Sequence, residues 1–522
     1  MMRRPPRPAT TSSQRLTPRT RGETLATEPK THFPEPAVVR STTDPAAPPD
    51  PRPATIGELR AAGWRSRTVK EELRANLVRR LAAGTPIFPG IVGYDETVIP
   101  SIENAILAGQ DIVFLGERGQ AKTRLARLLV GLLDEWLPVV RGGELNDDPF
   151  APISAAARAI VEEQADDTPI DWLPRDRRYA EKLATPDITI ADLIGEVDPI
   201  RVAEGRYLSD ELTLHYGLIP RANRGIFALN ELPDLAERIQ VGLLNILEER
   251  DVQIRGFTIR LPLDLLVVAS ANPEDYTSRG RIITPLKDRL GSQIRTHYPR
   301  SLDHEIAIVR QEKQAFPELA EIPPVFTPGF MEELVAELTH LARRSPEISQ
   351  RSGVSVRVSV ANMEVLEAAA IKRAVRLREP MAAPRISDLG AVLAATTGKV
   401  EVETVGEDTP EERIVERLVT KAVFATFNRR ASLDQLAPVI EAFEDGLIIE
   451  TGERVPSREY VRWMGEVPGL RESVARLGTF DVTDGAEEPA LVASAVEFLL
   501  EGLHLQRRLN KDRGAAGVTY RR

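Results

Sequence analysis

The fold is decided by one stretch of the chain, Phe114-Leu115-Gly116-Glu117-Arg118-Gly119-Gln120-Ala121-Lys122-Thr123. It follows Asp111-Ile112-Val113 and opens an apolar-periodic run from Leu125 to Trp136. An apolar strand that turns through glycines into Lys-Thr at the head of a helix is the plan of a phosphate-binding loop, in which backbone N–H groups and the helix dipole face the phosphates. The stretch therefore predicts nucleotide binding.

The side chains at the end of this loop have distinct predicted roles. Lys122 can reach the β/γ-phosphates, and Thr123 can hold Mg²⁺. The usual pattern has glycine immediately before the lysine, where this chain has Ala121; Gly119 is the remaining inner glycine. The alternative is a strand-turn-helix that merely contains Gly and Lys. The predicted nucleotide-binding residues of the loop are Gly116, Gly119, Gln120, Ala121, Lys122 and Thr123.

Length and composition limit the classes of protein that the chain can form. Its 522 residues exceed one ordinary core, so we expect two or three folded units. Hydrophobic residues at 42% and charged residues at 28% are typical of a soluble globular protein. A net charge of −10 gives no general basic field for nucleic acid, which we therefore do not expect as a partner.

The absence of cysteine excludes disulfides, zinc-thiolate sites and cysteine nucleophiles, and it suits a reducing cytoplasm. The histidines show no i,i+4 or HExxH pairing, so a permanent transition-metal site is not expected. No apolar run approaches the ~18 to 20 residues of a membrane span, and the N-terminus lacks the apolar core of a signal peptide. We expect a cytoplasmic protein with no membrane span.

The chain divides into four predicted regions. Residues 1–55 are rich in proline and arginine and are expected to be a disordered tail. In residues 56–300 short apolar runs alternate with helical patterns, which predicts a doubly wound parallel α/β sheet preceded by a helical pattern from Ile56 to Ala83. Residues 133–186 have one Ala-rich helix in an otherwise polar stretch. Residues 301–400 and 401–522 are predicted to be all helical.

Hydrolysis of a nucleotide also needs an acidic group at the end of a neighbouring strand. The run from Gly225 to Leu229 is an apolar strand that ends in Asn230-Glu231. Glu231 is a credible polariser of water. Asn230 stands where an aspartate is expected and would hold Mg²⁺ less strongly than a carboxylate. The alternative for this run is a buried strand with capping residues.

These stretches together resemble the AAA+ ATPases of the magnesium-chelatase I-subunit and MoxR group, over about residues 87–395. The run Gly217-Leu218-Ile219-Pro220-Arg221-Ala222-Asn223-Arg224-Gly225-Ile226 leads into the acidic strand as it does in that group, and Ala121 is similar to its phosphate loops. Val252 to Leu261 resembles the group's pre-sensor hairpin, and Thr189 to Tyr207 resembles its helix insertion.

The resemblance implies roles for further residues. Asn272, in Ala271-Asn272-Pro273, would orient the attacking water, and Ile91 and Val92 would flank the adenine or simply pack as an apolar loop. Arg289, in Thr284-Pro285-Leu286-Lys287-Asp288-Arg289-Leu290, would be an arginine finger that reaches the next subunit.

Two of these arginine assignments have alternatives. Arg289 could instead pair locally with Asp288 or Glu274. Arg357 would be the sensor in the helical lid, with Arg343 and Arg351 as alternatives.

The implied function is ATP hydrolysis with Mg²⁺, in a homo-oligomeric ring that is hexameric by resemblance and that remodels a partner protein. The usual partner in the group is a protein with a von Willebrand factor type A domain. Two alternatives are a regulatory or scaffold protein that binds ATP and hydrolyses it poorly, as Asn230 suggests, and a magnesium-chelatase subunit proper.

A DNA helicase or transcription activator would use Arg255 and Arg260 of the hairpin, but the GAFTGA loop of the activators is absent. Residues 502–511 could form a docking helix or an ordinary packed helix. The substrate, the ring size and the role of residues 401–522 are not readable from the sequence.

Overall fold

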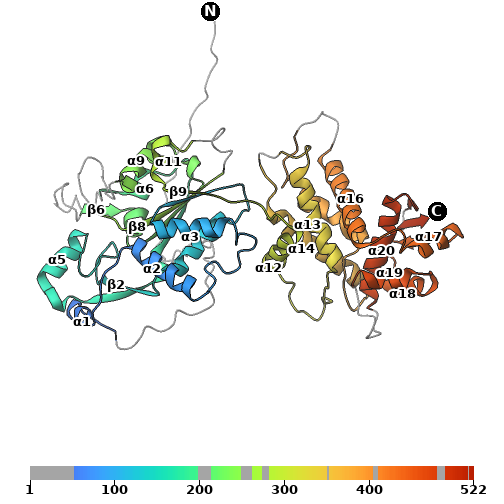
Figure 1. The fold of residues 1–522 in the computed structure, drawn as a ribbon, viewed down its shortest axis with the longest axis horizontal. Coiled ribbons are helices and arrows are strands. Elements are labelled where there is room, and N and C mark those ends of the chain that lie inside the picture. The colour runs from blue at the N-terminus through green and yellow to red at the C-terminus, as the bar shows by residue number, and fades with distance from the viewer. Residues whose placement is uncertain are drawn as a thin grey trace, which may run out of the picture. The chain divides into compact units, whose positions relative to one another are not determined.

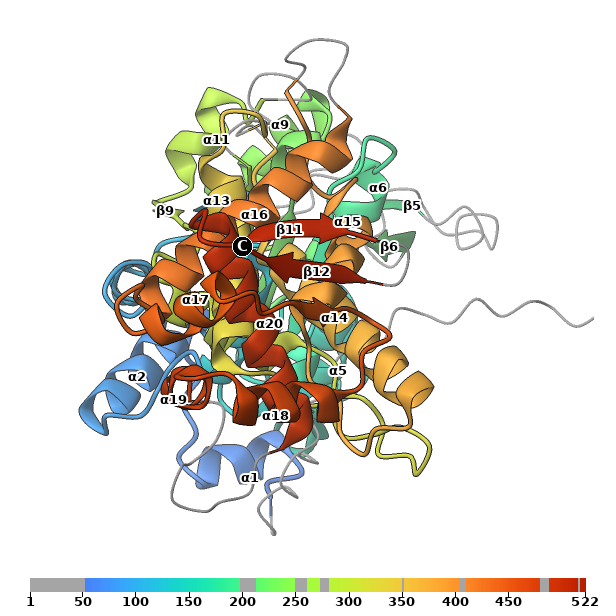
Figure 2. The ribbon, with the colours of Figure 1, turned by 90° about the vertical axis from the view of Figure 1, so that its right-hand side faces the viewer.

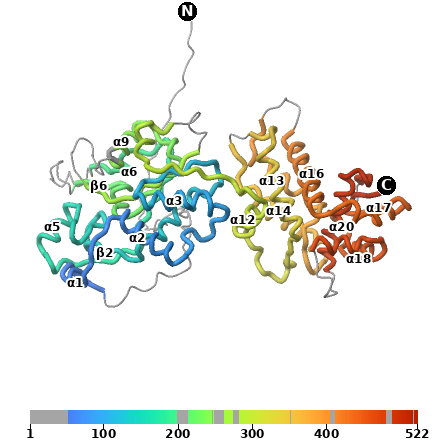
Figure 3. The backbone as a smooth tube through the Cα atoms, in the orientation of Figure 1, coloured from blue at the N-terminus to red at the C-terminus, as the bar shows by residue number. Residues whose placement is uncertain are grey.

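The computed structural model describes residues 52–197, 213–248, 261–272, 281–349, 352–403, 410–478, 488–514 and 517–522, which are coloured in Figure 3. All of them belong to one compact unit, Pro48–Arg522. The predicted tail up to residue 51, the hairpin arginines Arg255 and Arg260, and the end of the predicted insertion lie outside the described residues, as does Arg351.

The first part of this unit is α/β (Figure 1). Its strands are β1 (Ile112–Leu115), β2 (Trp136–Val140), β3 (Ile170–Pro174), β4 (Tyr179–Leu183), β5 (Gly195–Val197), β6 (Leu214–Tyr216), β7 (Gly225–Asn230), β8 (Leu265–Ala271) and β9 (Ser292–Arg295). Its α-helices are α1 (Ile56–Ala61), α2 (Val69–Ala82), α3 (Val98–Ala108), α4 (Lys122–Leu128), α5 (Ala155–Gln164), α6 (Ile190–Leu193), α8 (Leu218–Arg221), α9 (Glu237–Glu248) and α11 (Thr284–Arg289). Short 3₁₀ turns are η1 (Leu129–Leu132), η2 (Ala165–Asp167), η3 (Arg175–Arg178) and η5 (Leu232–Asp234).

Five of these strands form one parallel sheet in the order β4-β7-β8-β1-β9. Alternate residues of each central strand enter two different hydrophobic clusters: in β1, Ile112 and Phe114 belong to one cluster and Val113 to the other. The first cluster includes residues of α2, α3 and α4, and the second includes residues of α6, α8, α9 and α11. Helices therefore cover both faces, which confirms the predicted doubly wound sheet.

The second part of the unit begins after β9 and is mostly helical. Its elements are α12 (Leu302–Glu312), α13 (Gly329–Arg344), α14 (Val356–Leu377), η6 (Ile386–Gly390), α15 (Ala391–Thr396), α16 (Glu411–Arg430), α17 (Ala437–Glu444), β10 (Ile449–Thr451), α18 (Ser457–Glu466), α19 (Leu470–Arg476), α20 (Pro489–Leu505), β11 (Asn510–Arg513) and β12 (Val518–Arg521). One hydrophobic cluster contains buried side chains from elements throughout this part, the first being Val309 and the last Tyr520. The region predicted as a lid and the C-terminal region therefore have a common core.

Three details differ from the sequence-based expectations. The helical pattern from Ile56 to Ala83 is divided into α1 and α2, because the chain turns through Gly63, which has φ +73°. The polar stretch 133–186 contains β2, β3 and the sheet strand β4 in addition to the predicted helix. The C-terminal region is not wholly helical, since β10, β12 and β11 form a small antiparallel sheet, of which β11 and β12 lie side by side in Figure 2.

The end of the chain also bears on the two interpretations of residues 502–511. Helix α20 is buried at every position from Ala490 to Leu503, and the chain leaves the helix before Asn510, where β11 begins. Only residues 502–505 of this run are helical, so neither a docking helix nor an ordinary packed helix extends over all of it, and the helical part lies at the buried end of α20.

Candidate functional site

The predicted phosphate loop has the expected local structure. It joins the end of β1 to the start of α4, and Lys122 is the first residue of the helix. Gly119 has φ +76°, and a β-carbon there would overlap Ser355. Ala121 also has left-handed backbone angles, φ 57° and ψ 16°, which cost an L-residue free energy. Ala121 therefore occupies a position that glycine would fill without strain.

The ammonium group of Lys122 is buried among oxygen atoms of the loop and of β8. It donates to the carbonyl oxygens of Gly116 and Glu117 and, at 2.7 Å, to Oδ1 of Asn272. In turn, Nδ2 of Asn272 donates to Oε2 of Glu231 at 3.0 Å. Lys122, Asn272 and Glu231 thus form one chain of hydrogen bonds across the carboxyl ends of β1, β8 and β7.

The backbone at Glu231 directs this carboxylate toward the site. Glu231 follows β7 with φ 54° and ψ 48°, an unusual conformation for a non-glycine residue that tends to occur at functional sites. Its backbone N–H donates to Oγ of Ser270 at 3.2 Å. Ser270, which was not among the predicted site residues, therefore holds the turn that presents Glu231.

The predicted metal-binding pair is also close together. The hydroxyl of Thr123 lies 3.5 Å from Oδ1 of Asn230, which also accepts a hydrogen bond from Ser270 at 3.2 Å. Hydroxyl and amide oxygens are ligands that suit Mg²⁺, so the donor set fits that ion. Within the described ranges no three His, Cys, Asp or Glu residues form a group that could hold a metal ion.

A second residue absent from the predicted set, Glu181 of β4, contacts this pair. Its Oε1 accepts a hydrogen bond from Nδ2 of Asn230 at 2.7 Å. Glu181 also accepts two hydrogen bonds from Arg127 of α4, at 2.8 and 3.1 Å. No signal in the sequence pointed to Glu181, because it lies in a polar segment remote from every motif.

Strand β9 and the loop before α3 support the phosphate loop from the side. Thr296 donates to Oε1 of Gln120 at 2.7 Å, and that oxygen also accepts from the backbone of Glu117. The hydroxyl of Tyr94 lies 2.7 Å from the carbonyl oxygen of His297 and 3.0 Å from that of Gln120, and burial raises the pKa of Tyr94 to about 12. These contacts fix the loop independently of nucleotide.

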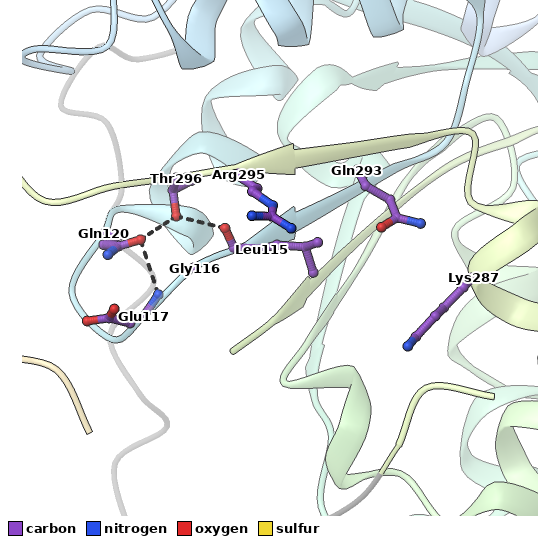
Figure 4. A pocket seen from close by; sticks show the side chains of 8 residues that line it. All are labelled: Leu115, Gly116, Glu117, Gln120, Lys287, Gln293, Arg295 and Thr296. Carbon is purple, nitrogen blue, oxygen red and sulfur yellow. Dashed lines mark hydrogen bonds between the residues drawn. The ribbon is translucent and has the colours of Figure 1, made fainter. Parts of the chain in front are cut away.

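A cavity of about 450 Å³ lies beside the loop, as Figure 4 shows. Gln120, Glu117 and Thr296 are joined by hydrogen bonds at its wall, and two cationic side chains, Lys287 and Arg295, also line it. The complete lining is Leu115, Gly116, Glu117, Gln120, Lys287, Gln293, Arg295 and Thr296. The space next to the phosphate loop is therefore polar and positively charged.

The start of α14 lies at the phosphate loop. Ser355 caps this helix by accepting from the backbone N–H of Arg357 at 3.1 Å, and it is the residue packed against Gly119. The side chain of Arg357 is exposed. The competing Arg343 is instead paired with the buried Glu305 at 2.8 Å and stacked on the ring of Tyr298. Both arginines lie near Ser355, since Arg343 also donates to the carbonyl oxygen of Val354 at 2.9 Å, but of the two only Arg357 is exposed.

The other predicted site residues make their described contacts outside the phosphate loop. Ile91 and Val92 are half-buried, and Ile91 packs on the cluster under α2 and α3. The preceding Gly90 accepts a hydrogen bond from Gln311 of α12 at 3.0 Å. Arg289 ends α11, where its guanidinium lies 4.0 Å from Asp288 and donates to the carbonyl oxygen of Pro285 at 3.3 Å. Neither of these partners belongs to the phosphate loop.

Comparisons with known proteins find similarity to nucleotide-binding families over part of the chain. The sigma-54 interaction domain family matches residues 204–292. The magnesium-chelatase subunit ChlI of Nostoc sp. is 26% identical over 282 residues, which cover 52% of this chain and 70% of the relative. The magnesium-chelatase 38 kDa subunit of Acidiphilium rubrum is 29% identical, covering 43% of this chain and 62% of the relative.

A solved structure of NtrX from Brucella abortus in complex with ADP is 17% identical, with a TM-score of 0.39, and the match covers 68% of this chain and 66% of that one. This likeness is too distant to add to the fold assignment. Among the curated relatives, the matched part spans from 52% to 77% of the relative's own length. What those whole proteins do is therefore not transferred directly to this chain.

The doubly wound sheet, the phosphate loop and the polar ends of β7 and β8 define an AAA+ ATPase, a class of nucleotide-binding proteins. Within that class, the chain is similar in sequence to the magnesium-chelatase I subunits. The residues that match the sigma-54 interaction domain family include the run from Gly217 into β7, on which the sequence resemblance partly rested. In the part of the chain that the structure describes, no helix is both long enough and apolar enough to cross a bilayer.

Proposed function

We propose that the chain hydrolyses ATP with Mg²⁺ and uses the free energy to remodel a partner protein. The observation that carries the proposal is the chain of hydrogen bonds from Lys122 through Asn272 to Glu231. It brings a cation for the phosphates, a polar amide and a carboxylate to one place at the carboxyl ends of three parallel strands. Ligands of open α/β sheets bind at this edge.

Each side chain has a role that its position supports. Lys122 would bind the β/γ-phosphates, and Thr123 and Asn230 would hold Mg²⁺, which when bound would supply positive charge next to the phosphate oxygens. Glu231 accepts a proton from the attacking water, and Asn272 orients that water. The αL backbone of Glu231 and the hydrogen bond from Asn272 hold the carboxylate in place before the nucleotide arrives.

Turnover and binding by the purified full chain test this function. Lys122→Ala is expected to abolish both ATP binding and turnover, whereas Glu231→Gln is expected to keep binding and lose turnover, because it removes only the base. The competing function is a nucleotide-responsive regulatory or scaffold protein, which the neutral Asn230 favours. Tight ATP binding without turnover at any protein concentration would establish that competing function.

We also propose that the active form is a homo-oligomeric ring, hexameric as the resemblance implies, in which Arg289 acts on the ATP of the next subunit. Arg289 lies at the end of α11, where its guanidinium is 4.0 Å from Asp288 and donates to the carbonyl oxygen of Pro285 at 3.3 Å. A mixture of Lys122→Ala and Arg289→Ala chains is expected to regain turnover that neither has alone, since a mixed ring contains some interfaces with both groups intact. A mixture that stays inactive at ring-forming concentrations contradicts action in trans.

The partner that we propose is a protein with a von Willebrand factor type A domain in the cytoplasm, and this rests on the family resemblance. A role as a magnesium-chelatase subunit proper is the alternative, and the similarity to ChlI supports it. Co-purification from the native cell, followed by identification of the bound proteins, distinguishes these two. The DNA-binding alternative has no support in the described residues, because its hairpin arginines lie outside them.

A further inference from the structure

The side chain of Asn230 has a fixed orientation, although it carries no charge. Its Nδ2 donates to Glu181 at 2.7 Å, while its Oδ1 accepts from Ser270 at 3.2 Å and lies 3.5 Å from the hydroxyl of Thr123. Exchange of the amide nitrogen and oxygen would place an acceptor against the carboxylate of Glu181, so the hydrogen-bond network requires the orientation described. The carboxylate of Glu181 therefore turns the amide oxygen toward Thr123.

Glu181 is held firmly enough to have this effect. Strand β4 is the edge strand beside β7, and Glu181 pairs in register with Ala228, two residues before Asn230. The side chain of Glu181 is 20% exposed and accepts hydrogen bonds from Arg127 and, at 3.0 Å, from the hydroxyl of Tyr179. Arg127 lies on α4, the helix that begins with Lys122 and Thr123.

We propose that Glu181 is a positioning residue for the divalent cation and supplies, through Asn230, the negative charge that the expected aspartate would have carried. A hydrogen bond to a carboxylate is stronger than one to a neutral acceptor, and it increases the negative partial charge on the amide oxygen that faces Thr123. The carboxylate has thus moved from β7 to the neighbouring strand, with Asn230 between it and the cation. This inference rests on the proposed Mg²⁺-dependent nucleotide binding.

Arg127 presents the competing explanation, in which Glu181 only anchors α4 to the sheet. Both explanations involve the Arg127–Glu181 ion pair, but only ours involves the Glu181–Asn230 hydrogen bond. Arg127→Gln breaks the ion pair and leaves Glu181 against Asn230, whereas Glu181→Gln removes the charge from both contacts. The two variants are therefore a matched pair that separates cation positioning from anchoring.

The measurement is the binding of AMP-PNP, a non-hydrolysable ATP analogue, to the full chain at increasing Mg²⁺, with EDTA as the metal-free reference. Glu181→Gln is expected to raise the Mg²⁺ concentration at the midpoint about fivefold, the difference between a charged and a neutral acceptor. AMP-PNP affinity in EDTA should stay within about twofold, and Arg127→Gln should shift the midpoint by less than about twofold. An equal shift for the two variants overturns the proposal.

A double-mutant cycle with Asn230→Asp gives a second, independent test. In that background the introduced carboxylate takes the place of the amide group that donates to Glu181, so Glu181→Gln removes a repulsion between like charges and should lower the Mg²⁺ midpoint, compared with a rise of about fivefold beside Asn230. The same shift in both backgrounds overturns the proposal. Thermal unfolding without nucleotide shows whether each variant folds. If Glu181→Gln does not fold, Glu181→Asp replaces it, because its shorter side chain withdraws the carboxylate from Asn230. Glu181→Asp must then raise the Mg²⁺ midpoint, and an unchanged midpoint overturns the proposal.

The inference and the proposed function fail in different ways. If the wild-type chain binds AMP-PNP in a Mg²⁺-dependent way but does not turn over ATP, the proposed hydrolytic function is wrong. The role of Glu181 is then still supported by the shifts in the Mg²⁺ midpoint. Wild-type AMP-PNP binding that does not depend on Mg²⁺ overturns the role of Glu181.

Discussion

Lys122 donates a hydrogen bond to Oδ1 of Asn272 at 2.7 Å, which links the phosphate loop directly to the carboxyl end of β8. The other end of the same amide donates to Glu231 at 3.0 Å. One neutral side chain, that of Asn272, therefore fixes the positions of both the Lys122 ammonium group and the Glu231 carboxylate. A change at Asn272 should affect the alignment of the site more than its affinity for phosphate.

We predict that Asn272→Ala lowers kcat for ATP about 100-fold, the usual effect of removing one preorganised polar group from a transition state. The affinity for ATP should change by less than about threefold, because Lys122 keeps its two loop carbonyl contacts. Steady-state turnover and equilibrium binding, measured on the same preparation, separate the two effects. Weaker binding with unchanged kcat would show that Asn272 serves the phosphate loop and not the attacking water.

The strained backbone of Ala121 gives a prediction about stability. The left-handed conformation costs an L-residue roughly 1–2 kcal/mol. Glycine avoids this cost, but part of the gain is lost because glycine has more conformational entropy in the unfolded chain. Ala121→Gly should therefore raise the free energy of unfolding by about 0.5 kcal/mol and keep nucleotide binding, since φ at this position is 57°. Denaturant unfolding measures the change.

The matched control is Ala75→Gly in the middle of α2, where the backbone is right-handed and the same substitution should destabilise by about 1 kcal/mol. If both variants lose stability by the same amount, the left-handed conformation of Ala121 carries no strain in solution.

Alanine substitution should have different effects at the two arginines near the loop. At Arg343 it should lower the free energy of unfolding, whereas at Arg357 it should lower ATP turnover. Arg343 pairs with Glu305, which is fully buried. Burial acts to raise the pKa of Glu305, but the nearby His340 and the hydrogen bonds from Arg343 and Ser359 outweigh it and lower that pKa. Arg343→Ala leaves a buried carboxylate without this partner and should destabilise the helical part by about 3 kcal/mol.

Arg357→Ala, at an exposed side chain, should leave the unfolding free energy within about 0.5 kcal/mol and lower turnover about tenfold or more. Thermal unfolding and ATPase rates of the two variants make the comparison. Full activity in Arg357→Ala would remove it as the sensor.

The predicted site residues that the structure brings together share one property, namely that they follow buried central strands. Apolar runs identify β1, β7 and β8 without any knowledge of their partners, so Lys122, Glu231 and Asn272 could be placed at the same edge of a sheet. Asn272 and Glu231 required the family resemblance for their roles, and the structure shows them within hydrogen-bond distance.

Glu181 could not be found in this way. Its strand, Tyr179–Leu183, is an edge strand with half-buried side chains, so it has no apolar signature, and its neighbour Asn230 is 49 residues away in the sequence. The short strands β10, β11 and β12 were missed for a similar reason, since strands of three or four residues with exposed positions do not produce a periodic pattern. Contacts between segments that are far apart in the sequence depend on the tertiary structure, so the local sequence pattern does not predict them.

Tyr94 gives a prediction about pH. Burial raises its pKa from 10.0 to about 12, so above pH 10 the unfolded chain loses the phenolic proton while the native chain keeps it. The native state then binds more protons, and the free energy of unfolding must fall as the pH rises from 10 to 12, by up to about 2.7 kcal/mol from this group. Below pH 10 the contribution of Tyr94 is complete.

Tyr94→Phe isolates this effect from other groups that titrate in alkali. The variant loses the contacts of the hydroxyl with the carbonyl oxygens of Gln120 and His297 and should be less stable at pH 8 by about 1 kcal/mol. Because Phe cannot ionise, its stability should fall less steeply above pH 10, so the difference between the two proteins narrows and then reverses. Urea unfolding at several pH values between 8 and 11.5 measures both curves. Parallel curves across that range would mean that the Tyr94 hydroxyl is solvated in the native protein and does not support the phosphate loop.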